Sequence, residues 1–513
     1  MNNTFKMIIG ASFAVAVAFY ANSIMGDVSH GGFLVLAAVF GAYMAMNIGA
    51  NDVANNVGPA VGSGALTIGG AILIASVFEA GGALIAGGDV VGTIKKGIIS
   101  PDAFGGDPMV FVYAMSAALL AAALWLNLAT WLKAPVSTTH SIVGGVLGGG
   151  IAAGGFAIVS WGTMGKIAAS WVISPVLGGV IAAIFLYIIK SQIIYKDDRL
   201  SAAKKIVPIL VAVMAAAFIT YLTVKGLKKV WPVIVDTLSF LPQTKKPSFL
   251  IALLFGAIGA VITFVIVKPK IAKRVLNLDG TRESINLLFT IPLIFAAALL
   301  SFAHGANDVA NAVGPLAAVY DALTTQGVSA KAAIPLWVMI VGGVGISIGL
   351  ALFGPRLIRT VGSEITELDQ MRAFSIMMAA AITVVIASQL GLPVSSTHIA
   401  VGAIFGVGFL REWLDSKTMN VKQEKLQAAT EKLSILKADL DAFQTGDDYK
   451  GQVDGINAHK LQKKKVKSLK RSLRENYVKR GMVKKIIAAW VITVPAAAVL
   501  SAIIFFILKG VAV

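Results

Sequence analysis

The sequence has no cysteine among its 513 residues, and charged residues make up only 14% of it. Without cysteine the chain contains no disulfide bond, no thiolate ligand for a metal and no thiol nucleophile. Hydrophobic residues make up 57% of the chain, and its mean hydropathy is +0.81. This composition excludes a series of ordinary soluble domains and indicates an integral membrane protein.

Charge-free stretches recur along the chain, each long enough to cross a bilayer as a helix of about 20 residues. They cover residues 7–26, 28–51, 108–132, 167–189, 206–224, 247–267, 284–307, 332–355 and 486–508. Their number excludes a protein with one membrane anchor, and their length excludes the short alternating strands of a membrane barrel. The first stretch also resembles the core of a signal peptide, but we expect it to be retained as the first transmembrane helix.

Two repeated segments indicate an internal duplication. The segment GANDVANNVGP at 49–59 returns as GANDVANAVGP at 305–315 with ten of eleven positions identical, and PVSTTH at 135–140 returns as PVSSTH at 393–398. Each copy contains five apolar segments, an odd number, and two segments link the copies. The second copy therefore starts on the opposite side of the membrane, so the repeats are inverted.

The predicted fold is an all-α polytopic membrane protein with two inverted repeats of about five transmembrane or re-entrant segments each, about 12–13 in total. Its parts are an N-terminal transmembrane helix (1–32), the first repeat (33–190), a linker with two transmembrane helices (191–285), four segments of the second repeat (286–410), a cytoplasmic charged helical insertion (411–485) and the last helix of the second repeat (486–513). With the N-terminus inside, cytoplasmic loops receive 34 of the 44 Lys and Arg residues. Since cytoplasmic loops are enriched in positive residues, we expect the N-terminus in the cytoplasm and the C-terminus outside.

The insertion at 411–485 holds 19 Lys or Arg residues against 10 Asp or Glu. Leu426, Ala429, Leu433, Leu436, Leu440 and Phe443 are spaced three and four apart, which predicts an amphipathic helix. Residues 460–485 then contain twelve basic residues and one acidic residue. A helical hairpin on anionic lipid headgroups and a solvated linker both fit this pattern, and each fits better than a nucleic-acid site.

Two aspartates stand inside the repeated segments of this apolar chain. A carboxylate at membrane depth costs about 2.5–3.5 kcal/mol, so Asp52 and Asp308 need a compensating role. Asparagines flank both of them, and glycine and proline near each predict an interrupted helix. Asn51, Asp52, Asn307 and Asp308 are therefore candidate cation ligands, with Asp52 and Asp308 as Na⁺ ligands. A polar loop at the membrane interface is the alternative.

The second repeated element follows each proline with three hydroxyl residues. Hydroxyl groups and unpaired amides at a helix start make a donor-rich site for an oxyanion. The candidate anion ligands are Ser137, Thr138, Thr139, Ser395, Ser396 and Thr397. Hydrogen bonding back to their own helices is the alternative. His140 and His398 follow them, and we expect these histidines to be structural hydrogen bonders.

Neither repeated segment contains Lys or Arg, so two aspartates and an oxyanion would place at least three negative charges together. That arrangement is tolerable only if Na⁺ or H⁺ enters with the anion, which favours symport. Glu79 is a further buried acid, with a coupling role and a structural role equally open.

Both copies of the signature and both hydroxyl elements resemble the inorganic phosphate transporter family, over nearly the whole chain. The resemblance implies a phosphate symporter coupled to Na⁺ or H⁺, inverted repeats, broken segments and a homodimer in the cytoplasmic membrane, which is the inner membrane of a two-membrane cell. It also adds Asn55 and Asn311 to the phosphate ligands. The position of the polar insertion, inside the second repeat and not between the halves, departs from the usual pattern.

From these residues we expect a transporter that is not an enzyme, uses no cofactor, and has phosphate and membrane lipids but no nucleic acid as partners. A symporter for another oxyanion such as sulfate or arsenate follows similar binding rules. A membrane enzyme using Asp52 and Asp308 as acid and base is disfavoured, because two identical groups lack distinct environments. An anion channel is disfavoured by the acidic site.

Overall fold

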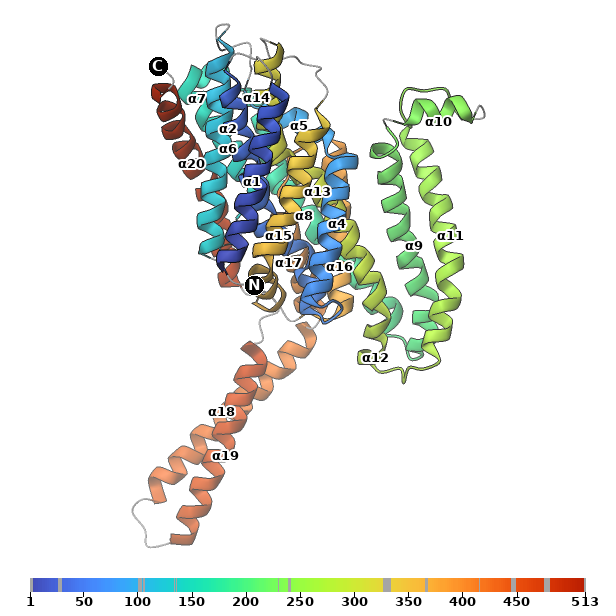
Figure 1. Ribbon diagram of the computed structural model, residues 1–513. Helices are drawn as coiled ribbons and strands as arrows, with labels where there is room; N and C mark the ends of the chain where they lie inside the picture. The colour runs from blue at the N-terminus through green and yellow to red at the C-terminus, as the bar shows by residue number, and fades with distance from the viewer. Residues whose placement is uncertain are drawn as a thin grey trace. The chain divides into compact units, whose positions relative to one another are not determined.

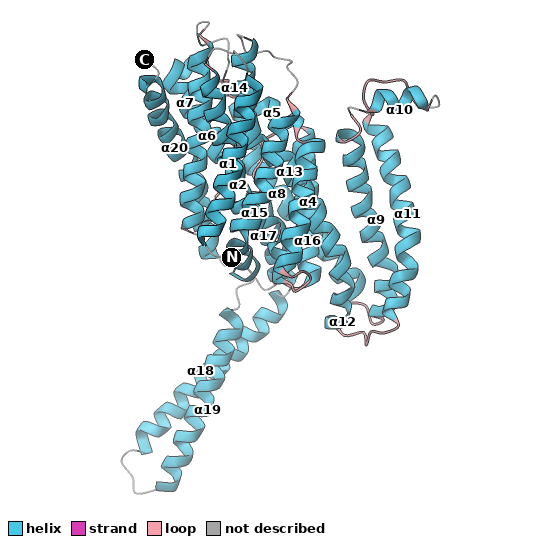
Figure 2. Cartoon of the chain, viewed as in Figure 1, coloured by secondary structure: helices cyan, strands magenta, loops and turns pink. Residues whose placement is uncertain are grey.

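The computed structural model describes residues 3–25, 30–99, 104, 107–132, 134, 136–228, 230–238, 241–325, 334–364, 368–414, 416–443, 449–474 and 480–511. In these ranges the secondary structure is helical, with one isolated bridge between Ile99 and Val159 (Figure 2). The chain divides into two compact units, Met1–Val407 with Gly481–Val513, and Gly408–Arg480. The prediction of an all-α polytopic membrane protein is confirmed.

The helices of the first unit are shown in Figure 1. They are α1 (Asn3–Met25), α2 (Gly31–Asn51), α3 (Val53–Gly62), α4 (Ile68–Ala86), α5 (Gly88–Gly92), α6 (Pro108–Trp131), α7 (Thr138–Gly154), α8 (Trp161–Ile189), α9 (Arg199–Lys225), α10 (Trp231–Thr237), α11 (Phe249–Val275), α12 (Arg282–Asn286), α13 (Thr290–Asp308), α14 (Ala310–Thr325), α15 (Leu336–Glu364), α16 (Gln370–Gln389), most of α17 (Ser396–Leu414) and α20 (Arg480–Val511). Short π or 3-10 turns lie at Thr93–Gly97, Phe156–Ile158, Lys190–Ile194 and Leu287–Phe289.

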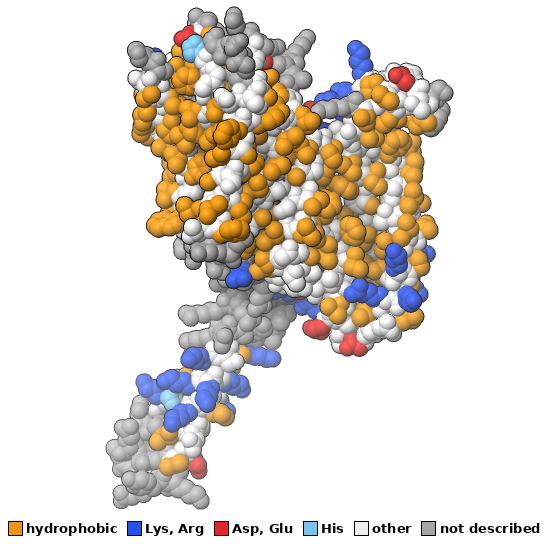
Figure 3. Space-filling view, viewed as in Figure 1, with side chains coloured by type: hydrophobic (Ala, Val, Ile, Leu, Met, Phe, Trp, Pro, Cys, Tyr) orange, Lys and Arg blue, Asp and Glu red, His pale blue; other side chains and the backbone are white. Residues whose placement is uncertain are grey.

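Eleven helical segments of the described chain are long and apolar enough to cross a membrane. One of them, Gly31–Gly62, joins α2 and α3, and another, Arg282–Thr324, contains α13 and most of α14. Large apolar side chains such as Leu73, Val172 and Leu250 are 66%, 68% and 76% exposed. Figure 3 shows hydrophobic side chains over much of the visible face of these helices, as lipid contact requires.

The first helix of each copy crosses the second long helix of the other copy, backbone against backbone. A Cβ atom added to Gly49 of α2 would lie 1.8 Å from the carbonyl oxygen of Ile346 in α15. At the equivalent position, a Cβ added to Gly305 of α13 would lie 2.1 Å from the carbonyl oxygen of Glu79 in α4. Only glycine allows these approaches, and they interlock the two copies.

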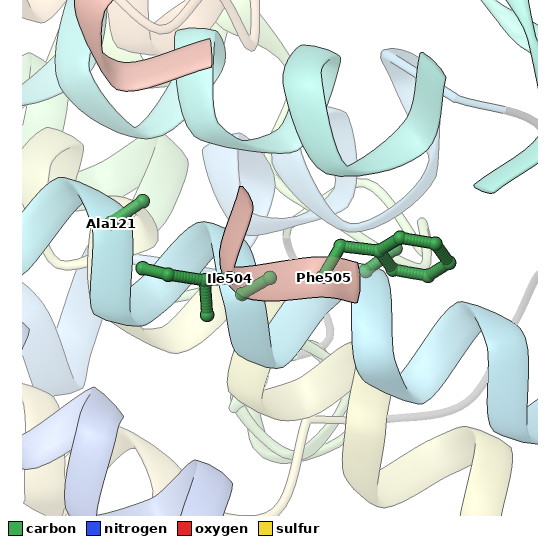
Figure 4. Packing of buried hydrophobic residues seen from close by; sticks show 5 residues of the cluster. Ala121, Ile504 and Phe505 are labelled. Atoms are coloured by element: carbon green, nitrogen blue, oxygen red, sulfur yellow. The ribbon is translucent and has the colours of Figure 1, made fainter. Parts of the chain in front are cut away.

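The last helices are exchanged between the copies in the same way. A Cβ on Gly148 of α7 would lie 2.0 Å from the carbonyl oxygen of Ala498 in α20, and one on Gly406 of α17 would lie 2.0 Å from that of Gly179 in α8. Figure 4 shows Ile504 and Phe505 of α20 in the buried cluster that includes Ala121 of α6. The repeats therefore form one core, and their opposite orientation in the membrane stays a prediction.

The second unit contains the helices α18 (Ser416–Phe443) and α19 (Tyr449–Arg474). They pack against each other, and the side-chain amide of Gln462 donates to the carbonyl oxygen of Ala429 at 2.8 Å. The buried side of α19 at this level carries Gln462 and Val466, which are 8% and 5% exposed.

Candidate functional site

Each signature aspartate lies where one helix ends and the next begins. In the first copy Asp52 is the single residue between α2 and α3, and its backbone N–H still donates to the carbonyl oxygen of Ile48 at 2.9 Å. In the second copy α13 ends at Asp308 and α14 begins two residues later. The predicted interruption is thus one residue long and lies at Asp52 in the first copy and at Val309, directly after Asp308, in the second. Pro59 and Pro315 lie inside α3 and α14, so neither proline marks the interruption.

The two aspartates meet at one threonine, and both are fully buried. Oγ1 of Thr138 lies 2.6 Å from Oδ2 of Asp52 and 3.1 Å from Oδ2 of Asp308. Thr397 donates from its Oγ1 to Oδ1 of Asp52 at 2.6 Å. A hydroxyl has one proton, so Thr138 can donate to only one carboxylate at a time. The pair of carboxylates is therefore short of donors and attracts a cation or a proton.

An asparagine of each copy reaches a threonine of the other copy. Asn55 donates from Nδ2 to Oγ1 of Thr397 at 2.9 Å. Asn311 donates from Nδ2 to Oγ1 of Thr139 and of Thr138, both at 3.2 Å. Thr139 and Thr397 hold the same position in the two PVS-type elements. The structure thus brings these predicted residues together across the repeat boundary.

The outer asparagines make a second matched pair of contacts. Asn51 donates from Nδ2 to Oγ1 of Thr130 at 2.9 Å, and Asn307 donates from Nδ2 to Oγ of Ser388 at 3.0 Å. The amide oxygens of both are buried and have no hydrogen-bond partner among the described residues. Oδ1 of Asp308 is buried without a described partner as well. Three oxygen atoms are therefore free to coordinate a cation.

Serine caps set the starts of α7 and α17. Ser137 accepts from the backbone N–H of His140 at 3.1 Å, and Ser395 accepts from that of His398 at 3.3 Å. The helices begin at Thr138 and Ser396, three residues after each proline position, so the prolines do not form the first turns. Pro135 itself lies outside the described residues. Thr138, Thr139, Ser396 and Thr397 lie in the first turns, where backbone N–H groups lack helical partners.

The two histidines of these elements lie in a row of ring contacts with two tryptophans: His398 stacks on Trp490, whereas His140 meets Trp171 edge to face. The ring centroids of His140 and His398 are 4.4 Å apart, those of His140 and Trp171 are 3.7 Å apart, and those of His398 and Trp490 are 3.5 Å apart. Among the described residues, Nδ1 of His140 and both ring nitrogens of His398 have no hydrogen-bond partner. The expectation that the histidine is a hydrogen bonder is therefore wrong for His398, and for His140 it is not supported at Nδ1. They pack as rings between α7, α8, α17 and α20.

Sequence reasoning missed His304, which joins Glu79 to the aspartates. Its Nδ1 lies 2.7 Å from Oε2 of Glu79, and its Nε2 lies 3.2 Å from Oδ2 of Asp308. Asn56 donates from Nδ2 to the other oxygen of Glu79 at 2.8 Å. Ligand atoms of Asp52, His304 and Asp308 all lie within 4.8 Å of one another. The spacing of His304 four residues before Asp308, on one helix face, could have revealed it.

A lysine of the linker also approaches the second copy. Lys225, at the end of α9, pairs with Asp89 of α5 and donates to the carbonyl oxygen of Ser388 at 3.2 Å. The hydroxyl of Ser388 accepts from Asn307, so the linker contacts the residue that supports Asn307. The two copies contain no equivalent of Lys225, and the site is asymmetric in this respect.

A buried polar site between the two repeated halves of a helical membrane protein is the architecture typical of secondary transporters. The chain belongs to the phosphate transporter family, which matches residues 48–501. A protein of Helicobacter pylori strain J99 named "Putative phosphate permease" is 49% identical over 521 residues, covering 98% of this chain and 95% of that protein. A protein of the same name from Chlamydia trachomatis serovar D is 42% identical over 390 residues, covering 74% of this chain and 90% of that protein.

A solved structure with the same architecture is named "The sodium-dependent phosphate transporter". It superposes with a TM-score of 0.72 at 31% sequence identity, covering 94% of this chain and 100% of that chain. The predicted family membership is confirmed by these matches, and with it the assignment of the fold to a phosphate transporter.

Proposed function

We propose that the protein imports inorganic phosphate by secondary active symport with a cation, and that this cation is Na⁺. The observation that carries the proposal is the pair of buried carboxylates, Asp52 and Asp308, that share the hydroxyl of Thr138. An anion can join two buried carboxylates only if positive charge enters with it, because desolvated like charges repel strongly.

The cation is held by Asp52 and Asp308 with the amide oxygens of Asn51 and Asn307. Carboxylate and amide oxygens are hard ligands that suit Na⁺. The similarity to a sodium-dependent phosphate transporter of known structure supports Na⁺ over H⁺. The contact of Glu79 with His304 favours H⁺ as the second candidate, since this pair could carry a proton to Asp308.

The phosphate is bound at the starts of α7 and α17. In the structure, Thr138 and Thr397 donate to Asp52. Cations bound to the carboxylates weaken these hydrogen bonds and release the hydroxyl groups to donate to phosphate, so cation binding prepares the anion site. The full set of proposed phosphate ligands is Ser137, Thr138, Thr139, Ser395, Ser396, Thr397, Asn55 and Asn311.

The proposed setting is the cytoplasmic membrane, with the N-terminus inside, the C-terminus outside and a homodimeric assembly. Alternating access around the buried site is the transport mode that we propose for two inverted repeats.

Uptake of radiolabelled phosphate into proteoliposomes tests the proposal, with Na⁺ and H⁺ gradients imposed separately. We expect accumulation driven by an inward Na⁺ gradient and weak competition by sulfate. Accumulation driven by H⁺ alone would replace Na⁺ with the second candidate, and stronger competition by sulfate or arsenate would change the substrate.

Two further measurements distinguish the proposed symporter from a channel and from an enzyme. Phosphate flux that never exceeds equilibrium, with either gradient, would indicate a channel and contradict symport. Release of phosphate from organic phosphate esters by the purified protein would indicate an enzyme.

A further inference from the structure

We propose that the hairpin α18–α19 lies along an anionic lipid surface and binds it through one face of α19. The proposal concerns the second unit and is independent of the phosphate and cation site. Among its supporting features are a one-sided distribution of basic residues, an exposed apolar continuation of the same face, and the direct connection of the hairpin to membrane-spanning helices.

Most of the exposed basic residues of α19 gather on one side of the helix, and Lys465 is the exposed lysine that lies on the opposite side. At about 100° per residue, Lys460, Lys463, Lys464 and Lys467 fall within an arc of roughly 100°. All four side chains are exposed.

This basic face is distinct from the face that packs on α18. The buried residues Gln462 and Val466 lie roughly 120° around the helix from the centre of the basic arc. The one acidic residue of α19, Asp454, lies outside the arc by the same helical geometry. The hairpin can therefore keep its internal packing while the basic face contacts a partner.

In the N-terminal part of α19, the same side of the helix carries apolar side chains instead of basic ones. Val453 and Ile456 fall on it and are 52% and 42% exposed. Ile435 of α18, at the level of Ile456 in the antiparallel pair, is 56% exposed. Figure 3 shows Lys and Arg side chains gathered on the hairpin, with hydrophobic side chains farther along it.

A lipid surface fits this combination better than a nucleic acid or water. Basic side chains bind headgroup phosphates while exposed aliphatic side chains enter the interfacial region. A site for single-stranded nucleic acid would be expected to interleave aromatic side chains with the basic ones, whereas the aromatic residues of α19 are Tyr449, its first residue, and His459. A merely solvated helix has no reason to collect cations on one arc.

The charge of α18 and the connections of the hairpin to α17 and α20 also support a lipid surface as the partner of α19. α18 carries five Lys residues and four acidic residues, so its charge is nearly balanced. The hairpin starts directly after α17, which ends at Leu414, and α19 is followed by the membrane-spanning part of α20 at Ile487–Val511. Both ends of the hairpin are therefore tied to the bilayer, which raises the local concentration of lipid near α19.

The absence of cysteine allows a direct test with the full-length protein. The variant Ile456→Cys carries an environment-sensitive fluorophore, and the protein is reconstituted into vesicles of neutral phosphatidylcholine or of phosphatidylcholine with phosphatidylglycerol. We expect a blue-shifted emission, quenched by brominated lipid, in the anionic vesicles and a water-like emission in the neutral ones. Salt should reverse the difference, because it screens exposed charges.

Matched charge reversals on the two helices separate a specific face from general charge. Lys460→Glu, Lys463→Glu and Lys467→Glu together should lower the lipid-quenched fraction at least about tenfold. Lys425→Glu, Lys432→Glu and Lys437→Glu on α18 make the same change of net charge and should leave it unchanged. Replacement of the same α19 lysines by Gln, with helical circular dichroism and size-exclusion elution as controls, keeps the test valid if the Glu variant misfolds.

Equal emission in neutral and anionic vesicles would overturn the proposal, as would equal effects of the two charge-reversal sets. A fluorophore protected only after addition of RNA would overturn it too, in favour of a nucleic-acid surface.

Discussion

Replacing Asp308 by asparagine removes one buried charge and leaves the local hydrogen bonding almost intact. Oδ2 of Asp308 lies 3.1 Å from Oγ1 of Thr138 and 3.2 Å from Nε2 of His304, whereas its Oδ1 has no partner among the described residues. The amide oxygen can therefore take the place of Oδ2, and the amino group that of Oδ1. Both oxygens of Asp52 accept from a threonine. Asp52→Asn must thus also disturb a hydrogen bond, at a further cost of about 1–3 kcal/mol.

The expected magnitude follows from the distance between the two carboxylates. The ligand atoms of Asp52 and Asp308 lie within 4.8 Å, and at an effective dielectric constant of about 20 two unit charges at that distance repel by about 3.5 kcal/mol. Asp308→Asn relieves this repulsion in the empty protein and removes a similar attraction for a bound cation. We expect the cation affinity of the variant to be lower by about two to three orders of magnitude.

Thermal unfolding in detergent, with Na⁺ titrated at fixed phosphate, measures this loss of affinity. The Tm of the wild type should rise with Na⁺, since a ligand of the native state stabilises it by mass action. The Tm of Asp308→Asn should not respond to Na⁺ over the same range. Asp236→Asn in α10 makes the same charge change at an exposed position and should respond like the wild type. A wild-type Na⁺ response in Asp308→Asn would refute the assignment of this carboxylate as a cation ligand.

Three further predictions address the anion site, the helix crossings and the topology. Ser137→Ala or Ser395→Ala should weaken phosphate binding by about 1–3 kcal/mol, measured by equilibrium binding of labelled phosphate, because each removes a cap and a buried hydroxyl. Gly49→Ala should abolish folding, seen as aggregation on size exclusion, because its Cβ would overlap a backbone carbonyl, whereas Gly69→Ala meets nothing within 4 Å and should elute normally. Cysteine at Gln427 should react only with reagents that reach the cytoplasm, and labelling from outside intact cells would reverse the predicted orientation.

The duplicated segments were enough to single out Asp52, Asp308, Thr138 and Thr397 as candidate site residues. Their direct contacts, in which Thr138 and Thr397 approach the carboxylates, were not predicted, because the alignment of the repeats places Thr138 opposite Ser396 and not opposite Thr397. The long apolar stretches predicted the membrane-crossing helices, because the thickness of the bilayer fixes the minimum length of such a stretch.

Features that depend on contacts between helices were not readable from the sequence. His304 has no counterpart in the first copy, where Ile48 stands, so the search for repeated residues passed over it. His140 and His398 lie next to polar residues along the chain, yet their neighbours in space are each other and two tryptophans. The exchange of helices between copies likewise depends on glycines whose partners lie in the other repeat.

Reversed coupling tests the proposed symport most directly. Proteoliposomes are given an inward phosphate gradient with no gradient of Na⁺, and uptake of radiolabelled Na⁺ is followed alongside uptake of phosphate. Because coupling is reciprocal, the phosphate gradient should drive Na⁺ into the vesicles in a fixed ratio to phosphate. This Na⁺ uptake should disappear in Asp308→Asn. Phosphate entry without Na⁺ uptake, in the wild type, would contradict Na⁺-coupled transport.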